Sequence, residues 1–372
     1  MNIGIDIREC EKGKATGIGR VLRNFLSYVG EHDTDNQYVL FGNQKTEYTD
    51  LSHNQRVRIM PEKVTLLWDH IILPQAIQEE KIDVFWSPYV KGPFFTKAKL
   101  VTTIHDLIPL IVSEYRTGKE FVGRIYFNII LTLSLKRATK IIAVSQCTKN
   151  DLIKRDALRE EKIGVITESF DERMYNPLDS GRDDILSRYG INEKFVFYCG
   201  NLNPHKNVGS LITAYQKLSP DIRKEYQLVI GGRKSACYKD LLRMVTQGDS
   251  EGKVIFTDHL PDKELPVLYR KASLFVFPSL YEGFGLPVLE AMACGTPVIT
   301  SRVSSLPEVA GDAAILVNPR DSNELAQVIE TVLCDKGLCN DLIQKGLARA
   351  KIFSREKMSR EILDILKGAY RS

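Results

Sequence analysis

Short apolar and β-branched runs alternate with helix-forming stretches along most of the 372 residues. In the first half of the chain, these runs predict strands at residues 2–7, 38–41, 83–86, 100–104 and 140–144. The stretches between them predict helices near residues 19–30, 68–80, 118–137 and 146–154. Alternation of this kind is typical of a parallel sheet with helices on both faces.

A second series follows residues 165–177, which break the pattern and predict a linker. Its strands are predicted at residues 195–199, 226–230, 254–256, 274–277, 297–300 and 314–317, and three helical segments end the chain. One hydrophobic core rarely supports so long a chain. We therefore predict an α/β protein with two doubly wound domains, 1–170 and 171–353, and a separate C-terminal helix, 354–372. Ligands bind at the carboxyl edges of such sheets, so we expect a cleft between the domains.

Composition narrows the class of protein. A net charge of only +4 gives no indication of a nucleic-acid partner. The seven cysteines are irregularly spaced without a CxxC pair, which indicates neither a zinc site nor a disulfide framework. We find no signal peptide, and no apolar run is long enough for a bilayer about 30 Å thick. We therefore expect a cytoplasmic protein.

The most informative segment is Glu282-Gly-Phe-Gly-Leu-Pro-Val-Leu-Glu290, which follows a predicted strand. Its glycines and its proline predict a turn and then a helix that starts near Leu286. The free N–H groups at the start of a helix suit a phosphate, and the two carboxylates can accept hydrogen bonds from sugar hydroxyls. Read alone, the segment indicates only a possible phosphate site, because glycine-rich turns are common in α/β proteins.

This segment and the following Cys294-Gly-Thr-Pro297 turn resemble the E-x7-E signature of retaining glycosyltransferases of family 4, which have the GT-B fold. The resemblance is strong over the second half of the chain and looser over the first. It implies two Rossmann-like domains that face each other across a cleft. The first domain would bind the acceptor and the second a nucleotide-sugar donor, and the last helix would cross back to the first domain.

The resemblance also implies roles for residues in the second half. Glu282 would hold the sugar hydroxyls and Glu290 the ribose, and Lys206 would hold the diphosphate. Asn201 stands where many members have arginine, and Arg233 follows the next strand. The expected donor-binding residues of this half are thus Asn201, Lys206, Arg233, Glu282, Gly283, Phe284, Gly285, Leu286, Pro287, Val288 and Glu290. Lys206 follows a loop in which Asn203 is a plausible helix cap.

Two segments of the first half are further candidates. Gly17 and Gly19 only partly match a dinucleotide fingerprint, and an ordinary loop and helix is the alternative; the resemblance gives such a loop to the donor or the acceptor. His105 and Asp106 follow a predicted strand. The resemblance implies that His105 lies near the transferred sugar, so the expected catalytic residues are His105, Lys206 and Glu282. Asp106 would bind acceptor hydroxyls, orient His105 or simply cap a loop.

The resemblance to mannosyltransferases of bacterial polysaccharide assembly suggests a function. We expect retaining, metal-independent transfer of a hexose from a nucleotide-diphosphate sugar, with GDP-mannose first and a UDP-hexose second. The acceptor would be a glycan or a lipid-linked saccharide in polysaccharide or lipopolysaccharide assembly, and no cofactor is expected. A nucleotide-sugar epimerase, a phosphorylase and a non-catalytic binding protein are the alternatives.

Residues 118–137 mix apolar and basic side chains. This helix could rest on the cytoplasmic face of the inner membrane as a peripheral contact, although a helix packed into the core is the favoured interpretation. Residues 167–169 stand where many family members have Pro-Asn-Gly, and we expect no site residue there.

Overall fold

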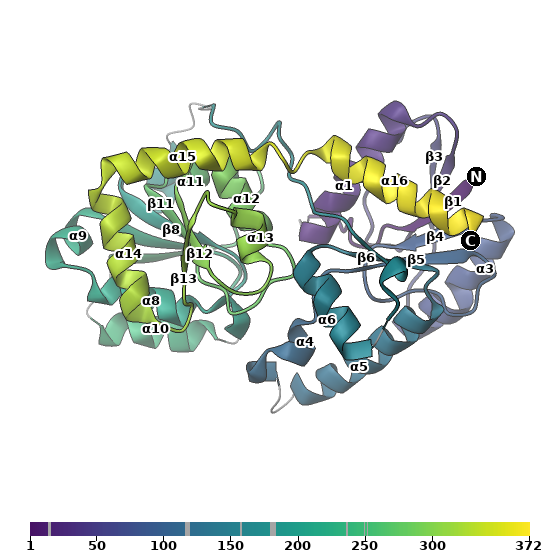
Figure 1. Cartoon of the computed structure of the whole chain (residues 1–372), viewed down its shortest axis with the longest axis horizontal. Coiled ribbons are helices and arrows are strands. Elements are labelled where there is room, and N and C mark those ends of the chain that lie inside the picture. The colour runs from purple at the N-terminus through teal and green to yellow at the C-terminus, as the bar shows by residue number, and fades with distance from the viewer. Residues whose placement is uncertain are drawn as a thin grey trace. The chain divides into compact units, whose positions relative to one another are not determined.

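The computed structural model describes residues 1–13, 16–115, 120–156, 158–178, 184–235, 237–248, 250 and 252–372. They form two compact units, each built on its own parallel sheet (Figure 1). Unit 1 contains residues 1–171 and 353–372, and unit 2 contains residues 172–352. The predicted pair of doubly wound α/β sheets is confirmed.

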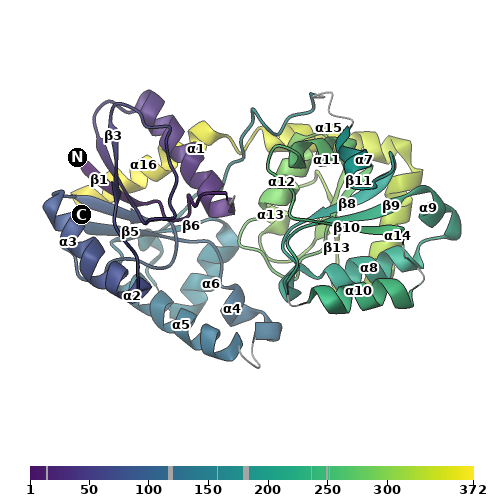
Figure 2. The same cartoon turned by 180° about the vertical axis from the view of Figure 1, so that it is seen from behind.

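The sheet of unit 1 has the strand order β3-β2-β1-β4-β5-β6-β7. Its strands are β1 (Asn2–Asp6), β2 (Gln37–Gly42), β3 (Gln55–Ile59), β4 (Val84–Ser87), β5 (Lys99–Ile104), β6 (Lys140–Ala143) and β7 (Ile163–Val165). The helices are α1 (Gly17–His32), α2 (Thr65–Leu67), the π-helical turn η1 (Trp68–Ile72), α3 (Leu73–Glu79), α4 (Ile108–Ile111), η2 (Ser113–Tyr115), α5 (Glu120–Arg137), α6 (Gln146–Asp156), η3 (Glu160–Lys162) and α16 (Arg355–Arg371). Helices cover both faces of this sheet (Figure 2). The inner strands are therefore nearly continuous apolar runs.

The sheet of unit 2 has the order β10-β9-β8-β11-β12-β13. Its strands are β8 (Phe195–Cys199), β9 (Gln227–Gly231), β10 (Val254–Asp258), β11 (Leu274–Phe277), β12 (Val298–Ser301) and β13 (Ile315–Val317). The helices are α7 (Asp184–Arg188), η4 (Pro204–Lys206), α8 (Val208–Lys217), α9 (Pro220–Glu225), α10 (Tyr238–Gln247), α11 (Leu265–Lys271), α12 (Leu286–Ala293), α13 (Leu306–Ala310), α14 (Ser322–Cys334) and α15 (Lys336–Ala350).

Each sheet contains one point at which the strand order reverses. In unit 1 this switch point lies between β1 and β4, and in unit 2 it lies between β8 and β11. The loops that follow the two strands of such a pair leave in opposite directions, which opens a crevice at the carboxyl edge where ligands bind. The topology therefore gives each unit one favoured position for a site.

Two strands of unit 1 are absent from the sequence prediction, and both lie at an edge of the sheet. β3 is partly exposed and carries charged side chains, and β7 has only three residues. Edge strands bury less apolar surface, so their sequence pattern is weaker. Because β7 ends at Val165, the expected linker at residues 165–177 begins too early, and Glu168 and Ser169 belong to unit 1.

The C-terminal helix α16 packs on unit 1, against α1, β4 and β5, as the resemblance implied (Figures 1 and 2). Its buried residues include Met358, Ile362 and Leu366. β7 accommodates the helix at Gly164, where a Cβ atom would lie 2.4 Å from Cδ1 of Ile365.

This packing gives a prediction for stability. Leu366→Ala removes a fully buried side chain and should lower the free energy of unfolding of unit 1 by about 2–5 kcal/mol. Gly368→Ala on the same helix meets no neighbour within 4 Å and should raise it by up to about 1 kcal/mol. Calorimetric unfolding measures both, and equal effects of the two substitutions would contradict this packing.

Candidate active site

The centre of the candidate site in unit 2 is an ion pair across the switch point. Lys206 follows β8 and Glu282 follows β11, and Lys206 Nζ lies 2.7 Å from Glu282 Oε1. The two side chains are only 12% and 10% exposed. The Lys206 ammonium also lies 5.1 Å from the centre of the Phe277 ring. The structure thus brings together two of the three residues predicted to be catalytic.

Backbone and amide hydrogen bonds fix the loops that carry this pair. Leu280 N donates to His205 O at 2.7 Å, and Asn207 Nδ2 donates to Pro278 O at 3.0 Å and to Pro319 O at 2.6 Å. Asn207 has φ 57°, a left-handed conformation that asparagine tolerates. Asn207 therefore links the ends of three strands, β8, β11 and β13.

The sequence prediction missed Asn207 and chose the wrong cap. Asn203 precedes η4, and its side chain makes no capping hydrogen bond. Helix α8 begins only after Asn207. The available signal was Asn207 directly before the apolar helical run that starts at Val208. The long-range hydrogen-bond partners of Asn207 were not visible in the sequence.

Two serines directly before α13 hold the turn between Glu282 and α12. Ser305 Oγ donates to Glu282 O at 3.0 Å and to Phe284 O at 2.7 Å, and Glu282 N donates to Ser304 Oγ at 3.0 Å. Gly285 has φ 122°, which favours glycine, and α12 begins at Leu286 as predicted. The turn is therefore held rigidly at the carboxyl end of β11.

Glu290 lies on α12 and is only 2% exposed, and Tyr269 OH donates to its Oε2 at 3.1 Å. Of the other expected donor residues in this segment, Pro287 is half-buried, whereas Gly283, Phe284, Gly285, Leu286 and Val288 are buried. Val288 is a weak candidate for donor contact, because its side chain is fully buried and its N–H donates to Gly285 O at 3.0 Å.

Asn201 and Arg233 lie exposed on two adjacent turns. Gly200 N donates to Gly231 O at 2.9 Å, and a Cβ on Gly232 would lie 1.8 Å from Gly200 O. The turns approach so closely that only glycine fits at this position. The structure gives no contact between Arg233 and the Lys206–Glu282 pair among the described residues.

In unit 1, His105 is held by two hydrogen-bond acceptors. Its Nδ1 lies 2.8 Å from Glu168 Oε1, and its Nε2 lies 2.7 Å from Pro88 O. Since a carboxylate and a carbonyl oxygen only accept, this geometry favours the imidazolium, in which both ring nitrogens donate. Burial opposes this charge, but Glu168 and the Pro88 carbonyl outweigh it, so the pKa of His105 lies above its usual value of 6.5.

Glu168 is the functional candidate that the sequence prediction excluded. It lies in the segment for which no site residue was expected, 63 positions from His105. Asp106 fits the loop-capping alternative, because its Oδ1 accepts a hydrogen bond from Ile108 N at 2.9 Å.

The predicted glycines of unit 1 lie at the start of α1. Thr16 caps this helix by accepting a hydrogen bond from Gly19 N at 2.9 Å, and a Cβ on Gly19 would lie 2.6 Å from Glu9 O. Gly19 is therefore required for the close approach of this loop to the helix. Gly17 is exposed, and its contact with a ligand stays a prediction.

The expectation that the enzyme needs no metal overlooked one Asp-x-Asp run, Asp33-Thr34-Asp35. Asp33 caps the end of α1, and its Oδ2 accepts hydrogen bonds from Asn36 Nδ2 at 2.8 Å and from Tyr38 OH. These bonds give Asp33 a structural role.

Family models identify the class of protein. The model described as "Glycosyltransferase Family 4" matches residues 15–172, and that described as "Glycosyl transferases group 1" matches residues 182–349. The O-antigen chain mannosyltransferase B of Escherichia coli is 35% identical over 294 residues, which cover 78% of this chain and 76% of that protein. The chain therefore belongs to glycosyltransferase family 4, and it is a hexosyltransferase.

Two further proteins resemble the chain. The serotype-specific mannosyltransferase WbdA of Escherichia coli is 33% identical over 261 residues, but the match covers 69% of this chain and only 32% of WbdA. The crystal structure of HepE from Anabaena, in complex with UDP and glucose, has a TM-score of 0.78 at 21% identity, with 99% and 100% of the two chains covered. At this identity the likeness shows the fold, and it confirms the predicted GT-B class.

The His105–Glu168 pair gives a pH-dependent prediction. Glu168→Gln keeps an acceptor but removes the negative charge, so the pKa of His105 should fall, which NMR titration of the ring measures. Because the folded pKa is raised, the pair stabilises unit 1 fully below the unfolded value of about 6.5. This contribution is lost as the pH rises through the folded pKa.

Urea unfolding should therefore show a loss of about 1–3 kcal/mol for Glu168→Gln near pH 6 that shrinks at higher pH. Glu161→Gln, which changes an exposed carboxylate of the same unit, is the control and should show neither effect. A loss that grows with pH would contradict the imidazolium assignment.

Proposed function

We propose that the chain transfers mannose from GDP-mannose, with retention of configuration and without a metal, to a glycan or lipid-linked saccharide in bacterial polysaccharide or lipopolysaccharide assembly. The observation that carries the proposal is the Lys206–Glu282 pair, which lies at the switch point beside the start of α12. The names of the related O-antigen mannosyltransferases support the choice of sugar and acceptor. A UDP-hexose is the second candidate donor.

The pair explains how one site serves both a diphosphate and a sugar. In the transition state of glycosyl transfer, negative charge develops on the departing diphosphate, and fixed positive charge stabilises it. Without donor, Glu282 neutralises the half-buried ammonium of Lys206. A diphosphate competes with Glu282 for Lys206, and the released carboxylate then accepts hydrogen bonds from the sugar hydroxyls.

Two further groups of unit 2 belong to the proposed donor site. The positive end of the α12 dipole favours an anion, although Pro287 has no N–H and Val288 N already donates to Gly285 O. Glu290 is proposed to bind the ribose, for which it must exchange or share the hydrogen bond from Tyr269. In unit 1, His105 is proposed to act as a fixed cation and not as a general base, because its two ring nitrogens face the Glu168 carboxylate and the Pro88 carbonyl.

The alternatives predict different products. An epimerase converts the nucleotide-sugar without any acceptor, and chromatography of the donor reveals this. A phosphorylase consumes phosphate, and one that uses pyridoxal phosphate absorbs in the near ultraviolet. A binding protein leaves the donor intact.

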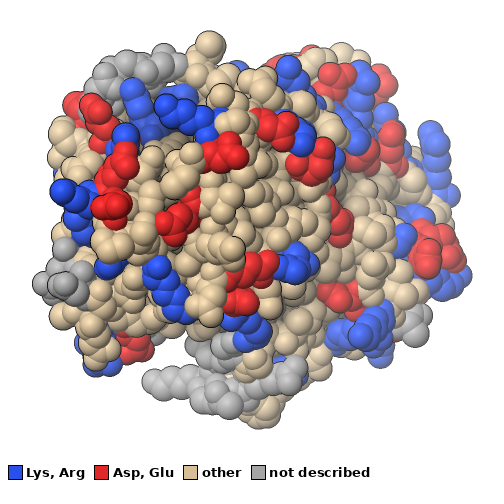
Figure 3. Space-filling view, turned by 60° about the vertical axis from the view of Figure 1, so that its left-hand side comes forward, with Lys and Arg blue, Asp and Glu red and all other residues tan. Residues whose placement is uncertain are grey.

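Positive and negative side chains are mixed on the face drawn in Figure 3, which gives no indication of nucleic-acid binding.

Lys206→Ala tests the catalytic assignment. If Lys206 acts on the leaving group, transfer from GDP-mannose should slow by about 100-fold or more, while the Kd for GDP-mannose from calorimetry rises much less. Lys194→Ala, which removes an exposed lysine paired with Glu225 in the same unit, is the matched control. Equal losses in turnover and in affinity would reduce Lys206 to a docking residue.

We also propose a peripheral membrane contact, because α5 is exposed along one side. Leu131 and Leu135 are buried, as the favoured interpretation of a core helix expected, but six other apolar residues of the helix are 42–70% exposed. These are Phe121, Val122, Ile125, Tyr126, Ile129 and Leu133. The helix therefore packs into the core on one side, and its other side is exposed along its length and not only at its ends.

The exposed side of α5 continues onto a neighbouring segment. Arg137 of α5 donates to Phe94 O at 3.1 Å, and the Phe94 ring stacks on His70 of η1 at 4.7 Å. Beside these contacts lie exposed Phe95 at 74% and exposed apolar residues of α2 and η1, which are Leu66, Leu67 and Ile71. Arg124 and Lys136 belong to α5, and Lys63 and Lys97 lie close in sequence to α2 and to Phe95. Among the described residues, no helix is long and apolar enough to cross a membrane.

A bilayer with anionic headgroups matches such a surface. Val122→Asp should reduce co-sedimentation with phosphatidylglycerol vesicles by about tenfold, since it places a charge where apolar surface would be buried. Leu242→Asp replaces an exposed leucine of α10 in unit 2 and serves as the control. Equal binding of both variants and the wild type, or equal binding to vesicles of neutral phosphatidylcholine, would exclude this contact.

A further inference from the structure

Unit 1 contains an open cavity of about 310 Å³ that none of the expected site residues lines. Its walls come from the ends of β1, β2 and β4 and from the segment after β3, and they include Arg8, Asn43, Glu62, Thr65, Tyr89 and Lys91. The cavity thus lies at the carboxyl edge of the sheet, at the switch point between β1 and β4. This is the position in unit 1 that corresponds to the Lys206–Glu282 pair in unit 2.

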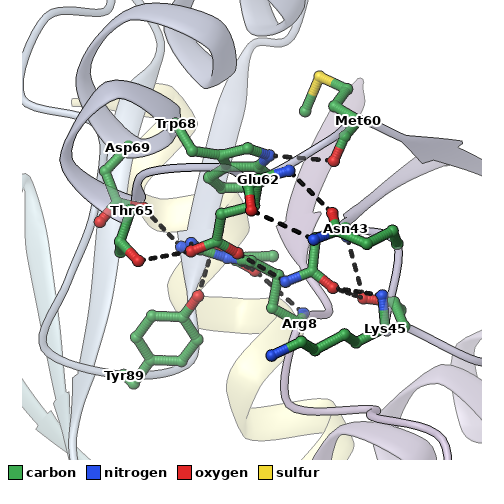
Figure 4. A network of polar contacts seen from close by, with 12 residues as sticks. Arg8, Asn43, Lys45, Met60, Glu62, Thr65, Trp68, Asp69 and Tyr89 are labelled. Carbon is green, nitrogen blue, oxygen red and sulfur yellow. Dashed lines mark hydrogen bonds and ion pairs between the residues drawn. The ribbon is translucent and has the colours of Figure 1, made fainter.

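Arg8 organises the cavity wall (Figure 4). Its guanidinium lies 2.8 Å from Asp6, 2.6 Å from Asp69 and 3.3 Å from Glu62, and it stacks on Trp68 with 3.8 Å to the ring centre. Its side chain is only 9% exposed. Every nitrogen of the fork already faces a carboxylate, so Arg8 cannot clamp a phosphate without breaking buried ion pairs.

Hydrogen bonds hold the other wall residues around Arg8 (Figure 4). Glu62 accepts from Asn43 Nδ2 at 2.6 Å and from Thr65 Oγ1 at 2.7 Å. Tyr89 OH donates to Asp6, and Tyr89 lines the cavity. The residue before Tyr89 is Pro88, whose carbonyl holds His105. The cavity therefore adjoins the histidine through two consecutive residues of one loop.

The charge of the wall defines what it can bind. Among the described residues, the charged side chains that line the cavity or pair with Arg8 are two cations, Arg8 and Lys91, and four carboxylates, Asp6, Glu9, Glu62 and Asp69. An excess of carboxylates repels a phosphorylated ligand and accepts hydrogen bonds from hydroxyl groups. A mixture of carboxylate, amide and hydroxyl groups beside an aromatic ring suits an uncharged sugar.

We propose that this cavity binds the terminal, uncharged sugar residue of the acceptor and that its carboxylates exclude phosphorylated sugars. The inference rests on the proposed glycosyl transfer, because only a transferase requires a second saccharide. The volume of the cavity is large enough for such a ligand, since pockets that bury a small ligand start at about 300 Å³. A single ring or two rings of a glycan chain fill it, with the rest of the acceptor outside.

Glu62→Gln tests the proposal, because it keeps the size of the side chain and removes one negative charge. The matched control is Glu80→Gln, since Glu80 is also paired with arginines and its side chain is 15% exposed, against 14% for Glu62, but it lies outside the cavity. Ligand-observed NMR on the full chain measures Kd for methyl α-glycosides of mannose, glucose, galactose and N-acetylglucosamine. Mannose 6-phosphate is the charged comparison.

The wild type should bind at least one neutral glycoside about tenfold more tightly than mannose 6-phosphate, and Glu62→Gln should narrow this ratio several-fold. Glu80→Gln should leave the ratio unchanged. Preference of the wild type for the phosphate, or equal ratios in the two variants, would overturn the proposal.

Release of GDP from GDP-mannose is measured in parallel, because it reports the donor site of unit 2. If GDP release and transfer occur while the glycoside ratio does not respond to Glu62→Gln, the acceptor inference fails and the proposed function stands. If no donor is consumed, the proposed function itself fails.

Discussion

The reversal of strand order in each parallel sheet is the constraint on which the sites of this protein depend. It makes the loops after β8 and β11 diverge, and it makes those after β1 and β4 do the same. At each reversal a basic side chain lies in the crevice, Lys206 in unit 2 and Arg8 in unit 1. The backbone topology thus determines where charge is buried, and the loop sequences determine which charge it is.

The two crevices treat their buried cation differently. Among the described residues, Lys206 has one carboxylate partner, Glu282. In the proposed function, a diphosphate replaces Glu282 at Lys206, and only this one ion pair is broken. Arg8 has three carboxylate partners and an aromatic platform, so its charge is already compensated and it serves as a scaffold. A single partner suits an exchangeable anion, whereas a saturated network suits a permanent wall. We propose that this difference separates a donor site for an anionic substrate from a site for a neutral sugar.

The sequence predicts local features well and distant pairings poorly. The strand before Glu282, the start of α12 and the position of His105 at a strand end follow from periodicity, proline and glycine. The edge strands β3 and β7 are missed because they bury little apolar surface. Glu168 and Asn207 are missed because their partners lie 63 and 71 or more positions away. Such contacts exist only once the sheet has formed, and no local pattern records them.

The central claim is that the chain transfers a sugar with retention from a nucleotide-diphosphate donor. The most direct measurement follows GDP-mannose labelled with ¹³C at C1 by NMR, in the presence of a neutral saccharide acceptor. We expect GDP and an α-linked mannoside, which keeps the anomeric configuration of the donor. A β-linked product would contradict the claim of retention, and conversion of the donor to another nucleotide-sugar without transfer would contradict the claim of a transferase.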